Sequence, residues 1–139
     1  VNSCVYCPYH IKNKSIARKK LTQDEIRQEV IALQDMGHKR LAIEAGEDPL
    51  HNPIEYILES IKTIYSIKHK NGAIRRVNVN IAATTVENYR RLHDAGIGTY
   101  ILFQETYHKE NYEKLHPRGP KVIMHIIQRQ WTALCRRYR

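Results

Sequence analysis

A five-residue pattern occurs twice in this chain, and both times it leads into a short apolar segment. Residues 33–37 (LQDMG) precede the apolar residues 41–43, and residues 92–96 (LHDAG) precede the apolar residues 100–102. The two copies lie 59 residues apart, which is about the length of two strand–helix units of roughly 30 residues each. Repeated units of this size build a parallel sheet with helices against it, either as an open doubly wound sheet or as a barrel.

Helix and strand signals alternate along the chain. Thr22 and Glu25 form a capping box, in which each side chain satisfies a free backbone N–H of the first helical turn. The sequence predicts helices that begin near Thr22, Pro53 and Val86 and end before Gly37, Asn71 and Gly96. It predicts strands over 40–45, 76–82 and 99–104. The last strand is nearly continuous in apolar residues, so we expect it to be buried on both faces.

In either architecture the ligand site lies at the carboxyl ends of the parallel strands. Polar residues gather there: Glu44, Gly46, Glu47 and Asp48 after the first strand, Asn78 and Asn80 in the next, and Gln104, Glu105 and His108 after the last. Any one of them alone is more simply a helix cap or a loop residue. Three strand ends together predict a binding site. No G-x-G-x-x-G follows a strand, which counts against a dinucleotide-binding fold.

Cys4 and Cys7 form a C-x-x-C pair near the start of the chain, and Cys135 is the third cysteine. A structural zinc site needs four ligands, and a thioredoxin-type pair follows a strand, so both are poor matches. Two ordinary free thiols stay open as an alternative. The motif would read C-x-x-x-C-x-x-C, with three ligands for an iron–sulfur cluster, if the residue before Val1 were a cysteine.

The composition is that of one globular domain with a core, since 42% of the 139 residues are hydrophobic and 27% are charged. The net charge of +9 normally suggests a nucleic-acid or anionic membrane partner. However, residues 122–139 hold four arginines and no acid, and Arg18, Lys19 and Lys20 are most simply a solvated face. Without a long apolar stretch or a signal peptide, we expect a cytoplasmic protein with no nucleic-acid or membrane partner.

Several segments together resemble one enzyme family. They are residues 4–10 (CVYCPYH), 13–14 (NK), 18–22 (RKKLT), 45–49 (AGEDP), 75–82 (RRVNVNIA) and 104–108 (QETYH). In a nearly ungapped run from Val1 to Lys121, the chain resembles the radical S-adenosylmethionine tyrosine lyases that mature [FeFe]-hydrogenase. The thiamine-pathway 2-iminoacetate synthases share the cysteine motif and the QETYH run, but they usually have Gly-Phe after the last cysteine and lack the EDP pattern. The maturases are therefore the better match.

The resemblance implies an α/β fold that is part of a (βα)6 TIM-type barrel, with parallel strands 2 to 4 and their helices. It implies two cofactors, a [4Fe-4S] cluster held by three cysteines and S-adenosylmethionine bound to the fourth iron. Cys4 and Cys7 match the second and third cluster ligands. Reductive cleavage of S-adenosylmethionine gives a 5'-deoxyadenosyl radical, which in this family breaks the Cα–Cβ bond of L-tyrosine to give p-cresol and dehydroglycine.

The resemblance assigns further roles and partners. Tyr6 matches an aromatic residue near the adenine of the cofactor, and Gly46 and Glu47 match a segment that meets its methionyl amino group, where a carboxylate suits an ammonium group. Glu105 matches a position expected to meet the ribose or the amino-acid end of the cofactor. The implied partners are L-tyrosine, an electron donor and the hydrogenase maturation proteins. The family converts dehydroglycine to carbon monoxide and cyanide at a second cluster in a separate C-terminal domain.

From Val122 onward the chain departs from the family, in which Gly-Pro-Lys is followed by a helix resembling HDYAYHTEAMDRAM. Here Lys121 is followed by VIMHIIQRQWTALCRRY. One choice of synonymous codons for that stretch, read from the third base of its first codon, gives HYAYHTEAMDRAMQAV. We therefore expect a frameshift just after Lys121, with residues 1–121 as a partial radical SAM core and residues 122–139 as an out-of-frame tail. Cys135 is then not a cluster ligand.

Two functional classes follow from these predictions. As an enzyme fragment, the chain belongs to a gene whose upstream codon is Cys and whose other frame continues the barrel. The isolated 139 residues are then expected to be inactive and not to fold cooperatively, because both sheet edges are unpaired. As a small, non-catalytic metal-binding module, the chain folds alone. The start at Val1 favours the fragment.

Overall fold

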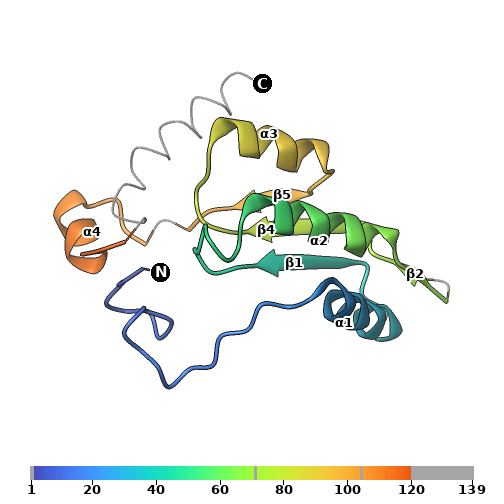
Figure 1. Ribbon diagram of the computed structural model, residues 1–139. Helices are drawn as coiled ribbons and strands as arrows, with labels where there is room; N and C mark the ends of the chain where they lie inside the picture. The colour runs from blue at the N-terminus through green and yellow to red at the C-terminus, as the bar shows by residue number, and fades with distance from the viewer. Residues whose placement is uncertain (1, 71, 104, 120–139) are drawn as a thin grey trace.

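The computed structural model describes residues 2–70, 72–103 and 105–119 of the chain (Figure 1). Helices and strands alternate along this part, which confirms the predicted α/β class. The tail expected over residues 122–139, with Cys135 in it, lies outside the described residues, as does Gln104. Within the described part, no helix has the length and apolar character needed to cross a membrane.

Three parallel strands form the central sheet, in the order β1 (Arg40–Glu44), β4 (Arg76–Asn80) and β5 (Thr99–Ile101). The middle strand β4 pairs along its whole length with β1 and over three residues with β5. Parallel neighbours cannot be joined by a tight turn, so each pair needs a crossover connection that contains a helix. The predicted parallel sheet is confirmed, and the carboxyl ends of all three strands lie at one edge.

The first three helices lie close to their predicted positions. They are α1 (Gln23–Asp35), α2 (Ile54–Ser66) and α3 (Val86–Asp94). At the start of α1 the hydroxyl of Thr22 accepts a hydrogen bond from the Glu25 N–H at 3.2 Å, and the Glu25 carboxylate accepts one from the Thr22 N–H at 2.9 Å. The predicted capping box is therefore confirmed.

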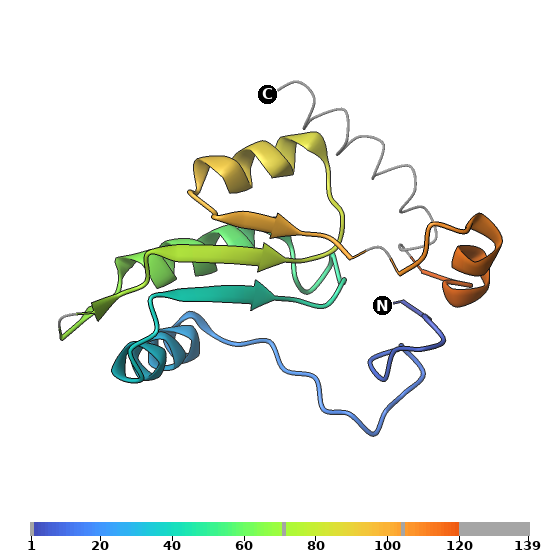
Figure 2. The same ribbon diagram turned by 180° about the vertical axis from the view of Figure 1, so that it is seen from behind.

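The core lies between α2 and the sheet. Ile57, Ile61 and Ile64 form the buried face of α2, and they belong to one apolar cluster with Val77 and Val79 of β4. Figures 1 and 2 show α2 lying along the strands, and it contacts both α1 and α3. The three helices therefore cover the same face of the sheet.

The opposite face of the sheet carries small and polar side chains. Asn78 and Asn80 alternate with the buried valines of β4, and Ala42 and Glu44 lie beside them on β1. Alternate residues of a strand point to opposite faces. Helices that cover one face of a parallel sheet are what a segment of a TIM-type barrel shows, with the opposite face turned to the barrel interior.

The strand β5 differs from its prediction in length and in burial. It ends at Ile101 rather than at residue 104, Thr99 is exposed, and Tyr100 is only half-buried. Among the described residues β5 pairs with β4 alone, so it is an edge strand. The apolar side chains of this segment instead contact the neighbouring helix. The rings of Tyr100 and of Tyr89 in α3 meet edge to face, with their centres 4.9 Å apart.

Two elements were not predicted. A short antiparallel hairpin of β2 (Lys68–His69) and β3 (Gly72–Ala73) follows α2, and helix α4 (Lys109–Leu115) follows the segment after β5. In Figure 1 the arrowheads of the central strands point toward the side of the molecule where α4 and the start of the chain lie. The predicted ligand-binding edge of the sheet therefore faces these two segments.

We expect Leu92→Ala to lower the free energy of unfolding by about 2–5 kcal/mol, because Leu92 has no exposed surface and its truncation leaves a cavity under α3. The matched control is Leu50→Ala, since Leu50 is 82% exposed and should change the free energy by less than about 0.5 kcal/mol. Urea unfolding of the larger enzyme that the sequence predicts measures both. Equal losses in the two variants would contradict the core described above.

Candidate functional site

The cysteine loop, residues 2–13, carries the C-x-x-C pair. Cys4 is buried, Cys7 is half-buried, and neither forms a disulfide bond. The N–H of Cys7 donates to the carbonyl oxygen of Cys4 at 3.3 Å, so that Val5 and Tyr6 form the tip of a tight turn. The two sulfur atoms are thus carried by one turn at the edge of the sheet where the strands end.

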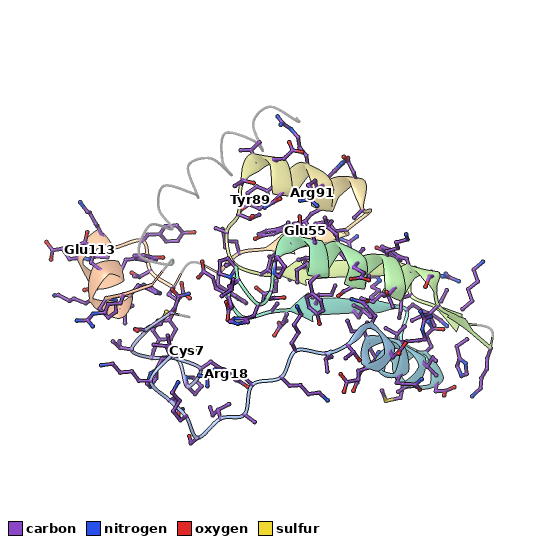
Figure 3. The ribbon with its side chains drawn as sticks, in the orientation of Figure 1. Cys7, Arg18, Glu55, Tyr89, Arg91 and Glu113 are labelled. Atoms are coloured by element: carbon purple, nitrogen blue, oxygen red, sulfur yellow. The ribbon has the colours of Figure 1, made fainter. Side chains whose placement is uncertain are left out.

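Arg18 holds the cysteine loop in its folded-back shape (Figure 3). Its guanidinium donates to the carbonyl oxygens of Tyr9 and His10, each at 3.1 Å, and to that of Asn13 at 2.9 Å. The prediction that Arg18 belongs to a solvated face was therefore incomplete. The side chain is exposed, but with a further bond to the Ile16 carbonyl oxygen at 3.3 Å it satisfies four carbonyl groups of a segment that has no regular secondary structure.

The segment after α4 contacts the cysteine loop through its backbone. The N–H groups of Ser3 and Val5 donate to the carbonyl oxygens of Arg118 and Leu115 at 3.1 and 3.0 Å. Gly119 has a φ of +105°, and a Cβ built there would lie 2.9 Å from the Asn2 Cα and closer still to its side chain. Only glycine combines this backbone conformation with such a close approach.

Glu47 lies beside the cysteine loop, as the sequence predicted for the carboxyl end of β1. Its carboxylate accepts a hydrogen bond from the Asn2 side-chain amide. Gly46 precedes it, and a Cβ added to Gly46 would meet no atom within 4 Å. The Asn52 amide holds this turn by donating to the Gly46 carbonyl oxygen at 3.2 Å. The Gly46–Glu47 turn therefore offers a carboxylate next to open space.

Tyr6 joins the cysteine loop to Glu105. Its hydroxyl donates to the Glu105 carboxylate at 2.7 Å. Partial burial, and then the negative charges of Glu105 and Cys4, raise the pKa of Tyr6 far above its usual value. The hydroxyl therefore stays protonated and remains a hydrogen-bond donor. This places Cys4, Tyr6 and Glu105, three of the predicted site residues, around one point.

The electrostatics of Tyr112 link this point to Glu47. Burial raises the pKa of the Tyr112 hydroxyl, and the charges of Glu105, Cys4 and Glu47 raise it further, in that order. The hydrogen bonds of Asn2 with Glu47 and of Tyr6 with Glu105 show the same convergence, because both begin in the cysteine loop. The structure thus brings together residues from the cysteine loop, the β1 end and the β5 end, which is the convergence that the sequence predicted.

Other polar residues of the strand ends have local partners. Asp48 accepts from the His51 imidazole at 2.9 Å, and the hydrogen bond to His51 lowers the Asp48 pKa. Glu44 accepts from the Asn80 amide at 3.2 Å on the open face of the sheet. His108 caps α4 by accepting from the Asn111 N–H. Asp48 and His108 therefore fit the simpler interpretation as loop and cap residues, whereas Glu44 and Asn80 are strand residues that bond each other.

The sequence analysis missed Asn2, Tyr112 and His116. Tyr112 and His116 are buried, and Asn2 contacts both Glu47 and the Gly119 region. The apolar residues of α4 offered a weak signal, since Tyr112 and Leu115 lie three apart in a segment otherwise rich in charge. His116 contacts Tyr6 across 110 positions and Asn2 contacts Glu47 across 45, and no local sequence pattern reports such contacts.

The described residues include two of the three cysteine ligands that the resemblance implies for a [4Fe-4S] cluster. Thiolates are the ligands that iron–sulfur clusters take, and Cys4 and Cys7 offer two of them on one turn. Over residues 2–70, 72–103 and 105–119, no group of three or more His, Cys, Asp or Glu side chains is arranged to hold a metal ion. The described residues therefore supply two donors of the set. For S-adenosylmethionine, Glu47 supplies a charge opposite to that of the ammonium group, and the open side of Gly46 supplies room.

A family model described as the radical SAM superfamily matches residues 1–129. A crystal structure of HydG, a maturase of the [FeFe]-hydrogenase, is 58% identical with a TM-score of 0.92, covering 98% of this chain and 30% of that one. The HydG structure from Carboxydothermus hydrogenoformans is 39% identical with a TM-score of 0.82, covering 96% of this chain and 31% of that one. These matches confirm the resemblance inferred from the sequence.

A curated relative, the 2-iminoacetate synthase of Salmonella typhimurium, is 28% identical over 120 residues, covering 86% of this chain and 30% of the relative. The chain therefore spans about 30% of the length of the proteins that it matches.

We expect Gly119→Ala to loosen the cysteine loop, because the added methyl group collides with Asn2 and the backbone is strained at a positive φ. Amide hydrogen exchange at Ser3 and Val5 should become about tenfold faster. The matched control is Gly46→Ala, whose methyl group enters open space and should leave these amides unchanged. Identical exchange rates in the two variants would show that the close approach at Gly119 does not hold the loop.

Proposed function

This chain belongs to the radical SAM superfamily, and we propose that residues 1–121 are part of the core of a tyrosine lyase that matures [FeFe]-hydrogenase. The proposed reaction cleaves the Cα–Cβ bond of L-tyrosine to p-cresol and dehydroglycine, the source of the carbon monoxide and cyanide ligands of the hydrogenase. The observation that carries the proposal is the 58% identity to a HydG maturase over 98% of the chain. The proposed partners are an electron donor and the other maturation proteins.

Cys4 and Cys7 would hold two irons of a [4Fe-4S] cluster. When bound and reduced, that cluster supplies the electron that cleaves S-adenosylmethionine and starts the radical reaction. The protein's own contribution is to hold the two thiols on one turn, with Cys4 buried beside the Tyr6 hydroxyl. Arg18 and the segment after α4 keep this turn at the ends of the strands.

Four further residues would position S-adenosylmethionine. The Glu47 carboxylate would pair with its ammonium group. Gly46 would leave the space into which the amino-acid end fits, since it has no neighbour on its open side. Tyr6 would contact the adenine with its half-exposed ring, and Glu105 would bind the ribose or the amino-acid end. The hydrogen bonds that tie Glu47 and Glu105 to the cysteine loop support the assignment.

The second candidate is a 2-iminoacetate synthase, favoured by the 28% identity to the Salmonella typhimurium enzyme. The sequence resemblance implies the same cleavage of tyrosine for both families, so p-cresol alone does not separate them. They differ in the fate of dehydroglycine, which only the maturase converts to carbon monoxide and cyanide. The higher identity to HydG favours the maturase.

The whole protein, reconstituted with iron and sulfide without oxygen, should form p-cresol from L-tyrosine in the presence of S-adenosylmethionine and a reductant. Chromatography of p-cresol measures the lyase reaction, and trapping of cyanide tests the maturase. Formation of p-cresol without cyanide would favour the synthase. Absence of p-cresol from a protein that carries a full cluster would overturn the proposed lyase.

Replacing Cys4 or Cys7 by Ala should remove most of the bound cluster, because a cluster that loses one of three protein ligands is poorly held. Iron content and the visible absorbance of the reconstituted protein measure the loss. Val5→Ala is the matched control, since Val5 lies between the cysteines, is 63% exposed and has no ligand atom in its side chain. Full iron content in both cysteine variants would remove these residues from the metal site.

A further inference from the structure

His116 is the most deeply buried histidine of the described residues, and it follows α4 directly. Only 1% of its surface is exposed. Its Nδ1 lies 2.9 Å from the carbonyl oxygen of Tyr112, which can only accept, so Nδ1 carries the hydrogen. The imidazole also stacks on the Tyr112 ring, with the ring centres 4.1 Å apart. The orientation of the His116 ring is therefore fixed from within its own segment.

The other ring nitrogen of His116 points at the cysteine loop. Nε2 lies 2.9 Å from the Tyr6 hydroxyl, and the Tyr6 ring meets the imidazole edge to face with centres 5.5 Å apart. The same hydroxyl lies 2.7 Å from the Glu105 carboxylate, so its single hydrogen is shared between that carboxylate and Nε2. Tyr6 directly precedes Cys7. Its hydroxyl therefore contacts two groups that lie about a hundred residues further along the chain, Glu105 and His116.

The backbone around His116 makes a second set of contacts with the same loop. Val5 donates to the carbonyl oxygen of Leu115 and Ser3 to that of Arg118, so one helix-end carbonyl and one in the following turn are both satisfied by the cysteine loop. The close approach of Gly119 to Asn2 adds a third contact. The end of α4 and the turn after it therefore contact the cysteine loop at several successive residues.

We propose that His116 is a positioning residue for the cysteine loop, holding the Tyr6 side chain against Glu105 and thereby fixing the turn that carries Cys4 and Cys7. A loop without regular structure has many conformations, and a site is precise only where supporting contacts remove them. The inference rests on the proposed function, because only under it are Cys4 and Cys7 cluster ligands. His116 acts through Tyr6 and does not touch the reacting atoms.

The test compares His116→Phe, which keeps a ring to stack on Tyr112 but cannot bond Tyr6, with His116→Gln, which keeps an amide near the position of Nε2. The readout is the rate at which an iron chelator removes iron from the reconstituted whole protein without oxygen. His116→Phe should speed this loss about two- to tenfold, the effect of one lost hydrogen bond. His116→Gln should restore most of the difference. His93→Phe is the matched control, since the His93 side chain is 89% exposed on α3.

Tyr6→Phe provides a second variant that removes only the hydroxyl. If His116 acts through Tyr6, the double variant should lose iron no faster than the faster single variant, because the two changes break the same bond. Additive effects, or a His116→Phe protein that keeps its iron as the parent does, would overturn the proposal. If His116→Phe does not fold, Tyr6→Phe and His116→Gln decide: iron loss at the parent rate in Tyr6→Phe overturns it. A parent protein that takes up no cluster would instead refute the proposed function.

Discussion

The burial of Val77 and Val79 beneath α2 is the interaction on which the rest of the described structure depends. Both side chains have no exposed surface, and they lie on the strand that pairs with both of its neighbours. Because alternate residues point to opposite faces, the same two valines force Asn78 and Asn80 onto the other face. A slip of one residue would bury the two asparagines and expose the valines. The core contact therefore also fixes the register that aligns the three strand ends.

The site at those strand ends is assembled from segments far apart in the chain. The cysteine loop, the Gly46–Glu47 turn, Glu105 and His116 meet through a few polar contacts, chiefly those of Asn2 and Tyr6. These contacts gather the carboxylates and the Cys4 thiol around the hydroxyls of Tyr6 and Tyr112, whose pKa values are raised first by burial and then by these groups. Negative groups held together in this way are stabilised by a cation. The ammonium and sulfonium groups of S-adenosylmethionine have that charge, which is consistent with the proposed function.

The parts of the fold that were predicted correctly are those governed by local rules. The capping box of Thr22 and Glu25 and the apolar stripe of α2 depend on spacings of three and four residues, and both are present in the structure. The length and burial of β5 were wrong because they depend on which strands pair beside it. The roles of Arg18 and His116 could not be predicted, since their partners are set by how the loop folds back. That Glu47 and Glu105 lie at one edge of the sheet was predictable because parallel strands bring their carboxyl ends together, whereas Cys4 reaches that edge through the way its loop folds back.

Four basic side chains lie at the opposite end of the sheet from Glu47 and Glu105, so the net charge of +9 does not describe the surroundings of either end. Lys39, Arg40, Arg75 and Arg76 line a cavity of about 520 Å³ at the amino ends of β1 and β4, whereas Glu47 and Glu105 lie at the carboxyl ends. A five-residue strand separates the two ends by about 13 Å, which exceeds the screening length of about 8 Å at physiological salt. A ligand at either end therefore meets mainly the charges of that end. A cationic cofactor can be attracted to the carboxyl end of a strongly basic chain, and the total charge is a poor guide to what this site binds.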